Sequence, residues 1–148
     1  MLYELEVIDM VCDELEKQGY IIVSRKNQPI HNGKDIIAKK VESGVNRMVY
    51  IEAIGETSSF SNTKRYGKPF DRSQVKIHLS ELLFAVAEIL SMKKIENFHY
   101  KVGIAIPDNK DHREYISNIQ GFLDLAGIAV FFVKKEGVTK IDNGRWDW

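Results

Sequence analysis

Two short segments in the second half of the chain are mostly apolar and rich in β-branched residues. They read YKVGIAI over residues 100–106 and IAVFFV over residues 128–133. Runs of this length without regular polar alternation are typical of strands that are buried on both faces. Between them, residues 111–125 have the spacing of a helix, which Gly127 closes. A strand, a helix and another strand in this order predict a parallel pair that is joined by a helical crossover.

The first half of the chain predicts one helix followed by three strands. Apolar residues recur at helical spacing over residues 2–18, and Gly19 follows as a natural C-cap. Residues 20–25 and 47–54 are β-branched strand segments, and a further strand is expected at residues 34–41 between two turn sequences. Because short turns join neighbouring strands in antiparallel pairs, these three segments predict a meander.

The longest predicted helix follows a polar stretch over residues 55–68. Its apolar positions fit the 3.6-residue period, and they are Val75, Leu79, Leu82, Leu83, Val86, Ile89 and Leu90. Asp71 is a candidate N-cap, with Gln74 three residues further on. The element order is therefore αβββαβαβ, with a short edge strand expected at residues 138–141. This order predicts an α/β fold with a mixed central sheet flanked by helices.

Length and composition fit a single domain over residues 1–148, because 44% of the residues are hydrophobic. Basic and acidic residues both number 21, so any attraction to nucleic acid must come from local clusters. Cys12 is the single cysteine, which excludes an internal disulfide and a cysteine-based zinc cluster. The N-terminus lacks a basic signal region and no apolar run approaches a membrane span, so we expect a cytoplasmic protein without a membrane partner. Trp146 and Trp148 are expected to pack on the domain or on a second copy, which leaves a homodimer as one arrangement.

Two acidic residues in the predicted meander are candidate metal ligands. Asp35 lies near the start of the second strand and Glu52 lies in the third, and adjacent strands can bring both carboxylates to one side of a sheet. Mg²⁺ prefers oxygen ligands and keeps several waters, so this pair with a backbone carbonyl such as that of Ala53 would suffice. Mn²⁺ is the expected substitute. The same two acids also fit solvated or paired surface positions, with Asp35 stabilising the Asn32-Gly33 turn.

The element order and the two acids resemble the PD-(D/E)XK nuclease superfamily, whose fold is restriction-endonuclease-like. That family has an αβββαβ core with Asp at the start of one strand and (D/E)XK in the next. The matching residues here are Asp35 and Glu52-Ala53-Ile54, within residues 2–106. The strand end IEAIGETSS is similar to that of small stand-alone members, and the last helix and strands correspond to a C-terminal extension. The resemblance implies a Mg²⁺-dependent nuclease that acts on DNA.

The chain departs from this family at the motif lysine, because Ile54 stands in its place. Isoleucine cannot hold a water or neutralise a phosphate. Lys64 and Lys68 in the following loop, or Lys76 on the long helix, could supply the missing charge, since the lysine has moved to another element in some members. Otherwise the chain is a catalytically inactive member of the fold that binds nucleic acid or protein.

The long helix carries a second resemblance. Gln74-Val75-Lys76-Ile77-His78 is similar to the QxxxY motif of the RecB-like branch, with histidine in place of tyrosine. Gln74 and His78 lie one turn apart on a shared face, where they could orient the substrate or a water. Lys76 points elsewhere, which favours the pair over the lysine as site residues. The alternative gives Gln74 a capping role with Asp71, and His78 a boundary position.

The polar loop SSFSNTKRYGKPF lies between the acid pair and this helix. It interleaves Lys64, Arg65 and Lys68 with aromatic residues, a pattern that fits phosphate neutralisation and base stacking in nucleic-acid binding. The same sequence also fits a surface loop that has no binding role and whose aromatic residues anchor it to the core of the domain. Two further acids could join the site, namely Glu56 if the strand continues that far, and Glu4 on the inner side of the first helix.

Overall fold

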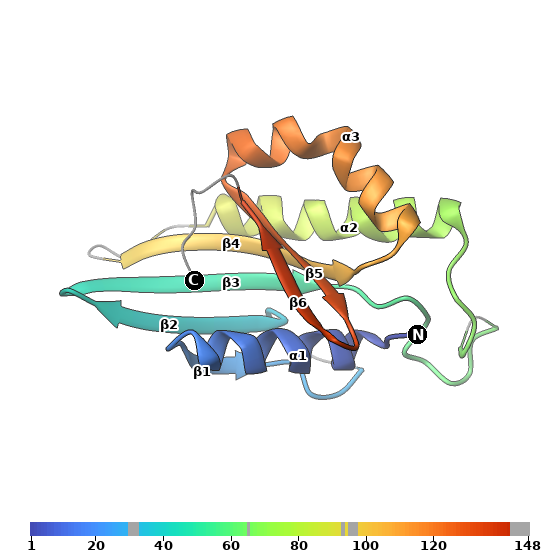
Figure 1. Cartoon of the computed structure of the whole chain (residues 1–148), viewed down its shortest axis with the longest axis horizontal. Helices are drawn as coiled ribbons and strands as arrows, with labels where there is room; N and C mark the ends of the chain where they lie inside the picture. The colour runs from blue at the N-terminus through green and yellow to red at the C-terminus, as the bar shows by residue number, and fades with distance from the viewer. Residues whose placement is uncertain (30–32, 65, 93, 95–97, 143–148) are drawn as a thin grey trace.

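Six strands form one mixed sheet, and three helices cover its two faces (Figure 1). The computed structural model describes residues 1–29, 33–64, 66–92, 94 and 98–142. Its elements are α1 (Glu4–Lys17), β1 (Ile21–Arg25), β2 (Ile36–Glu42), β3 (Val45–Ala53), α2 (Arg72–Leu90), β4 (Phe98–Pro107), α3 (Lys110–Ala126), β5 (Ile128–Lys134) and β6 (Gly137–Ile141). The predicted α/β class and element order are confirmed.

The strands lie in the sheet in the order in which they follow one another along the chain. β1, β2 and β3 form the predicted antiparallel meander, and β3, β4 and β5 pair in parallel through the crossovers α2 and α3. β6 closes the sheet as an antiparallel edge strand on β5. The register between β2 and β3 pairs Ile36 with Ile51. Asp35 and Glu52 are therefore the next cross-strand neighbours at this end of the sheet.

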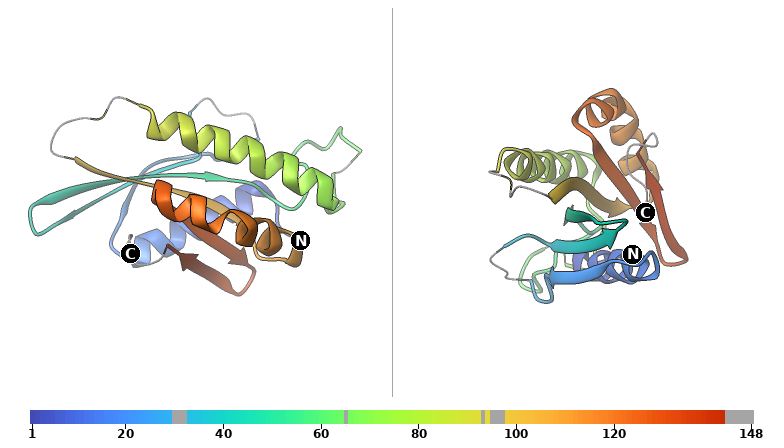
Figure 2. Two further views of the ribbon diagram at one scale, coloured as in Figure 1. Left: turned by 90° about the horizontal axis from the view of Figure 1, so that it is seen from above. Right: turned by 90° about the vertical axis from the view of Figure 1, so that its left-hand side faces the viewer.

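The helices form two layers with the sheet between them (Figure 2). α1 packs on one face through its buried residues, which are Val7, Ile8, Val11, Cys12 and Leu15. α2 and α3 pack side by side on the other face, over the apolar residues of β4 and β5. Burial raises the pKa of the Cys12 thiol to about 12. This thiol therefore stays protonated and serves as a packing residue.

A capping box fixes the residue at which α2 begins. The Asp71 side chain accepts a hydrogen bond from the Gln74 main-chain N–H (2.9 Å), and Gln74 Oε1 accepts one from the Asp71 N–H (3.0 Å). These bonds satisfy main-chain donors that the first helical turn leaves without partners. The predicted N-cap at Asp71 is thus confirmed, and α2 starts at the end of the sheet that holds Asp35 and Glu52.

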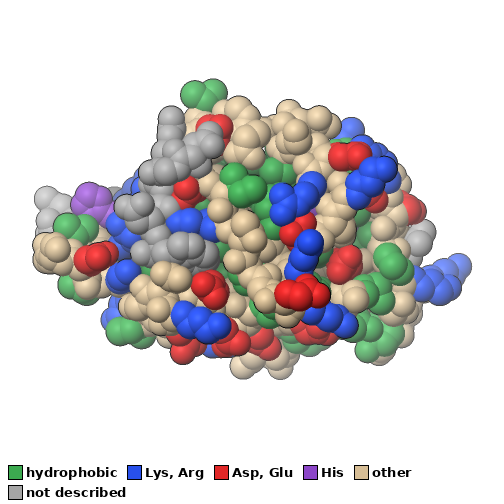
Figure 3. All heavy atoms as spheres, in the orientation of Figure 1, with side chains coloured by type: hydrophobic (Ala, Val, Ile, Leu, Met, Phe, Trp, Pro, Cys, Tyr) green, Lys and Arg blue, Asp and Glu red, His purple; other side chains and the backbone are tan. Residues whose placement is uncertain are grey.

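Charged side chains of both signs are interspersed over the face drawn in Figure 3. Ion pairs form between β1 and α1, where Arg25 pairs with Asp9 (3.2 Å) and Glu16 (3.2 Å). Among the residues described on this face, no extended surface of one charge is seen. In the described part of the chain, no helix is both long and apolar enough to cross a membrane. The residues Trp146 and Trp148, predicted to pack on the domain or on a second copy, lie outside the described residues.

Candidate functional site

Asp35 and Glu52 lie opposite each other where β2 begins and β3 ends. The main-chain N–H of Asp35 donates to Glu52 Oε2 (3.3 Å), and Asp35 Oδ2 accepts from the main-chain N–H of Ala53 (2.9 Å). Each carboxylate is therefore tied to the backbone of the other strand. The structure brings these two candidate ligands together, as the antiparallel meander predicts.

Glu52 is a buried acid that lies beside a second acid, Asp35. Only 8% of its surface is exposed. Burial, followed by the hydrogen bond and negative charge of Asp35, raises its pKa to about 8, although the Asp35 N–H and Lys34 partly oppose this. Removing a carboxylate from water and placing a second one beside it both disfavour the charged form. A cation between the two acids would relieve both penalties.

The start of α1 is held against the chain that follows β3. Leu2 donates its N–H to Glu56 Oε1 (3.0 Å), and the Glu56 N–H donates to the Leu2 carbonyl (2.8 Å). A Cβ at Gly55 would lie 2.5 Å from the backbone nitrogen of Glu4, so only glycine allows this approach. β3 ends at Ala53, so the condition for Glu56 to extend the acidic face is not met. Its remaining oxygen instead accepts a hydrogen bond from the Asn109 amide (3.0 Å).

Lys26 and Glu4 form a mostly buried ion pair beside Asp35. The main-chain N–H of Lys26 donates to the Asp35 carbonyl (2.8 Å), which continues the pairing of β1 with β2. Lys26 Nζ lies 2.6 Å from Glu4 Oε1. Burial raises the pKa of Glu4, the hydrogen bond from Lys26 opposes this, and the negative charge of Asp35 adds to it. The site therefore contains the amine of Lys26, which directly follows β1, and the carboxylate of Glu4 on α1.

Lys26 was not identified as a site residue from the sequence, although the predicted strand pairing places it beside Asp35. Once the first two strands are taken as an antiparallel pair, the end of the first lies beside the start of the second. Lys26 directly follows the first strand, and Asp35 directly precedes the second. The same argument that joins Asp35 to Glu52 therefore extends to a third strand end.

A pocket of about 320 Å³ opens at this end of the molecule. Glu4 and Lys26 lie in its wall, together with Ile54, His78 and the loop over residues 55–63. Most of the lining is apolar, and Ile54 contributes to it while it packs against the core below α2. Asp35 and Glu52 do not line the pocket, but both are near lining residues: the Asp35 carbonyl accepts a hydrogen bond from Lys26, and Glu52 precedes Ile54 by two residues.

The candidates on α2 separate into different surroundings. His78 lines the pocket, with its ring centre 4.3 Å from that of Phe70, and its Nδ1 lies 3.8 Å from Glu81 Oε2. The Gln74 amide is engaged in the capping box and is not among the residues that line the pocket. Lys76 is exposed and also lies outside the lining. Lys76 and the Gln74/His78 pair thus do not all line one pocket, and of the favoured pair only His78 lines it.

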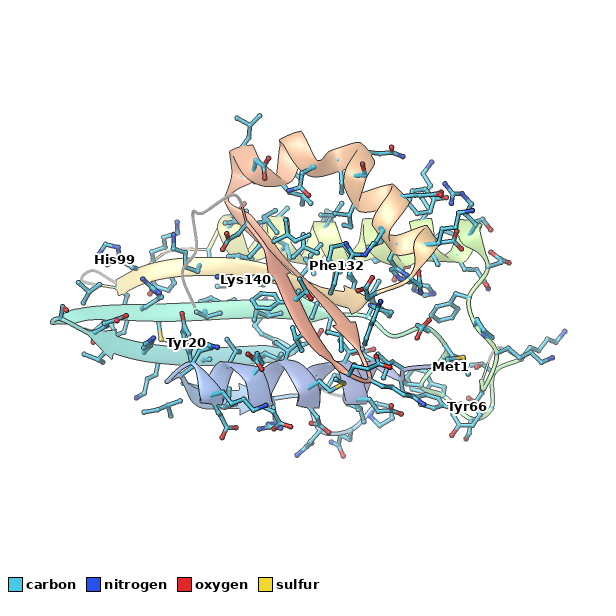
Figure 4. The ribbon with its side chains drawn as sticks, in the orientation of Figure 1. Met1, Tyr20, Tyr66, His99, Phe132 and Lys140 are labelled. Carbon is cyan, nitrogen blue, oxygen red and sulfur yellow. The ribbon has the colours of Figure 1, made fainter. Side chains whose placement is uncertain are left out.

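The basic loop lies at the same end of the molecule as the pocket. Tyr66 is close to the N-terminus in Figure 4, and its ring centre lies 5.5 Å from that of Tyr3. Lys64 and Lys68 are exposed on this loop. Arg65, the third basic candidate, lies outside the described residues.

The donor set at this site fits a hard divalent cation with few protein ligands. Across the described residues, no group of three or more His, Cys, Asp and Glu side chains is arranged to hold a metal. Two juxtaposed carboxylates remain, and Mg²⁺ is commonly held by one or two carboxylates together with waters and substrate phosphates. The buried Glu52 and the half-buried Asp35 beside it fit this requirement, and Ala53, whose carbonyl is a further candidate ligand, follows Glu52 on β3.

Comparisons with known proteins find structural similarity at low identity. The crystal structure of an XisH family protein from Nostoc punctiforme PCC 73102 is 14% identical, with 90% of this chain and 95% of that chain covered at a TM-score of 0.38. The crystal structure of a FdxN element excision controlling factor protein from Anabaena variabilis is 14% identical, with 93% and 96% covered at a TM-score of 0.40. No family model and no curated protein matches the sequence. Similarity of this size assigns neither a family nor an activity to the chain.

Proposed function

We propose that the chain is a Mg²⁺-dependent phosphodiesterase that acts on DNA. The observation that carries this proposal is the juxtaposition of the buried Glu52 with the half-buried Asp35, close to a pocket that Lys26 and His78 line. A carboxylate pair with a nearby cationic side chain suits a reaction in which negative charge develops on a phosphate. The resemblance of the strand ends to the PD-(D/E)XK motif supports the same reaction class.

Each side chain has a role in this proposal. Asp35 and Glu52 hold the metal, for which Mn²⁺ can substitute. When bound, the metal supplies a more acidic water and neutralises charge on the phosphate. His78 orients the water or the substrate from the pocket wall. Lys64 and Lys68 contact phosphates that flank the scissile bond.

Lys26 takes over the role of the missing motif lysine in this proposal. It lies in the same pocket wall as Ile54, which occupies the motif position. A lysine ammonium has three donors, and the ion pair with Glu4 leaves two of them for a phosphate oxygen. Burial of this ion pair also holds the ammonium in place, so that it need not be ordered when the substrate binds.

Replacing Glu52 by alanine is expected to reduce DNA cleavage in Mg²⁺ by more than about 100-fold, because one of two metal-holding carboxylates is removed. The measurement is the cleavage rate of single-stranded, duplex and branched DNA by equally purified proteins. Glu88→Ala is the matched control, since Glu88 is an exposed glutamate on α2. Equal cleavage by Glu52→Ala and Glu88→Ala would attribute the activity to a different site or to a contaminant.

Replacing Lys26 by methionine is expected to slow cleavage by roughly tenfold or more, while Mg²⁺ dependence is retained. In the double variant Lys26→Met/Ile54→Lys, a lysine returns to the motif position, and part of the lost rate should be restored. Lys76→Met on the exposed face of α2 is the control and should leave the rate unchanged. A normal cleavage rate in Lys26→Met would show that Lys26 does not take part in the reaction.

The alternative function is a catalytically inactive binding module, and one observation favours it. Ile54 packs against the core below α2 and gives the pocket an apolar wall where the motif places a cation. No cleavage by the native chain, together with cleavage by Ile54→Lys, would support this alternative. The scaffold would then have lost one chemical group and kept its metal-binding pair.

A further inference from the structure

The pocket beside the acid pair has a lining that a phosphodiester does not require. Phosphates are bound by cations, hydroxyls and main-chain N–H groups, and Lys26 with the nearby hydroxyl side chains can serve that need, but most of the lining surface is apolar. Phe60, Phe70 and His78 contribute three rings to it, and Ile54 adds a branched aliphatic wall. Rings and aliphatic side chains of this kind bind the flat faces of a heterocycle.

Resting on the proposed nuclease function, we propose that this pocket binds one unpaired nucleobase adjacent to the scissile phosphodiester. The preferred substrate is then DNA with an unpaired nucleotide at the cleavage position. A base that is paired within a duplex cannot enter such a pocket, because both of its faces are stacked and its edge is occupied. The pocket volume of about 320 Å³ lies at the small end of the range for ligand sites and suits a single ring system.

Phe60 lines the pocket and offers an exposed aromatic residue on which a base can stack. The residue remains 46% exposed, although hydrogen bonds hold its main-chain N–H and its carbonyl. Ser58 Oγ accepts a hydrogen bond from the Phe60 N–H (3.2 Å), and Thr63 Oγ1 donates to the Phe60 carbonyl (2.8 Å). The Thr63 N–H also donates to this carbonyl (3.1 Å). An exposed aromatic ring on a hydrogen-bonded turn loses little conformational freedom when a base stacks on it.

Phe60 also lines a second hollow of about 500 Å³, to which Gln28, Ser61 and Asn62 contribute as well. Pro29 and Ser59 form part of both walls. A strand that places one base in the pocket can therefore continue past Phe60 into the second hollow. The exposed Lys64 and Lys68 follow on the same loop and provide the positive charge that the backbone of such a strand requires.

Binding to three matched DNA duplexes tests this inference separately from catalysis. The duplexes differ at a single position, which is a normal base pair, an extra unpaired base, or an extra abasic site. Fluorescence anisotropy in Ca²⁺, in place of Mg²⁺, measures binding without requiring cleavage. We expect the native chain to bind the unpaired base roughly tenfold more tightly than either of the other two duplexes.

Two variants identify the residue that gives this preference. Phe60→Ala should bind all three duplexes equally, whereas Phe60→Trp should keep the preference because it keeps a ring. Phe122→Ala is the matched control, since Phe122 lies on α3, is 55% exposed and does not line the pocket. Its preference should equal that of the native chain.

The outcomes separate this inference from the proposed function. Equal binding of the three duplexes, or no binding at all, overturns the inference whatever the result of the cleavage assay. Cleavage in Mg²⁺ together with equal binding leaves the nuclease function standing without the base pocket. A tenfold preference that depends on Phe60, without cleavage by the native chain, supports the base pocket and counts against hydrolysis.

Discussion

Replacing Glu52 by glutamine is expected to stabilise the metal-free protein at alkaline pH by up to about 4 kcal/mol. Burial and the neighbouring Asp35 raise the pKa of Glu52 from its ordinary value of 4.5 to about 8. Between these values the folded chain keeps a proton that the unfolded chain has released. The free energy of unfolding therefore falls as the pH rises through this window, and it stays reduced above pH 8. Glutamine carries no charge and avoids this loss.

Urea unfolding in the presence of a chelator, at pH 5 and at pH 9, measures this difference. Glu52→Gln should exceed the native chain only slightly at pH 5 and by several kcal/mol at pH 9, in the direction that linkage requires. Glu88→Gln, at an exposed position of α2, should show no such pH dependence. An equal difference at both pH values would contradict the presence of a buried, ionisable carboxyl group at Glu52. The expected result would mean that this site is retained at a cost in stability, as is common for functional sites.

Lowering the pH from 6.5 to 4 is expected to cost the fold about 3 kcal/mol through His112. This side chain is 1% exposed, and its Nε2 has no hydrogen-bond partner. Burial lowers its pKa to about 4, a shift that the negative charges of Glu56 and Asp111 only partly oppose. The unfolded chain then binds a proton that the folded chain excludes. The stabilising effect of neutral His112 is complete above pH 6.5 and is lost as the pH falls through this window.

Substitution by leucine isolates this effect, because leucine fills the buried position without titrating. The stability lost between pH 7 and pH 4.5 should be about 2 kcal/mol smaller in His112→Leu than in the native chain, measured by urea unfolding at both pH values. His99→Gln is the control, since His99 is exposed and lies toward the opposite end of the sheet from the N-terminus (Figure 4). The same loss in all three proteins would exclude His112 as the titrating group.

These two groups act in opposite directions between pH 4.5 and pH 6.5. Rising pH increases the penalty at Glu52 and removes the penalty at His112. The native chain can therefore show little net change of stability in this range, although both effects are present. Single variants are required to separate the two effects, and comparison of their pH profiles gives the size of each.

The fold was predictable because its elements are visible in local sequence patterns. The segment IAVFFV has the composition of a doubly buried strand, and β5 is buried at six successive positions. Asp71 and Gln74 have the spacing of a capping box, and the structure contains that box. The juxtaposition of Asp35 with Glu52 followed from the antiparallel meander, because register determines which residues face each other across strands.

The surroundings of the acid pair were harder to predict, because they depend on tertiary contacts. The approach of α1 depends on the missing Cβ of Gly55, and this approach brings Glu4 to Lys26. The local sequence around Gly55 does not predict that the start of α1 packs against it. The sequence allows Gln74 either a role in the site with His78 or a capping role with Asp71. The hydrogen bond with Asp71 in the structure shows the capping role. The hydrogen-bond partner that such a side chain adopts can be identified only when the tertiary packing is known.

Titration with Mn²⁺ tests most directly whether Asp35 and Glu52 form a divalent-cation site. Electron paramagnetic resonance reports the free ion, and the native chain is compared with Asp35→Asn and with the exposed-site control Glu88→Gln. We expect about one bound Mn²⁺ per chain in the native and control proteins, and binding at least tenfold weaker in Asp35→Asn. Absence of binding by the native chain, or equal binding by Asp35→Asn, would contradict the assignment of this acid pair as the metal site.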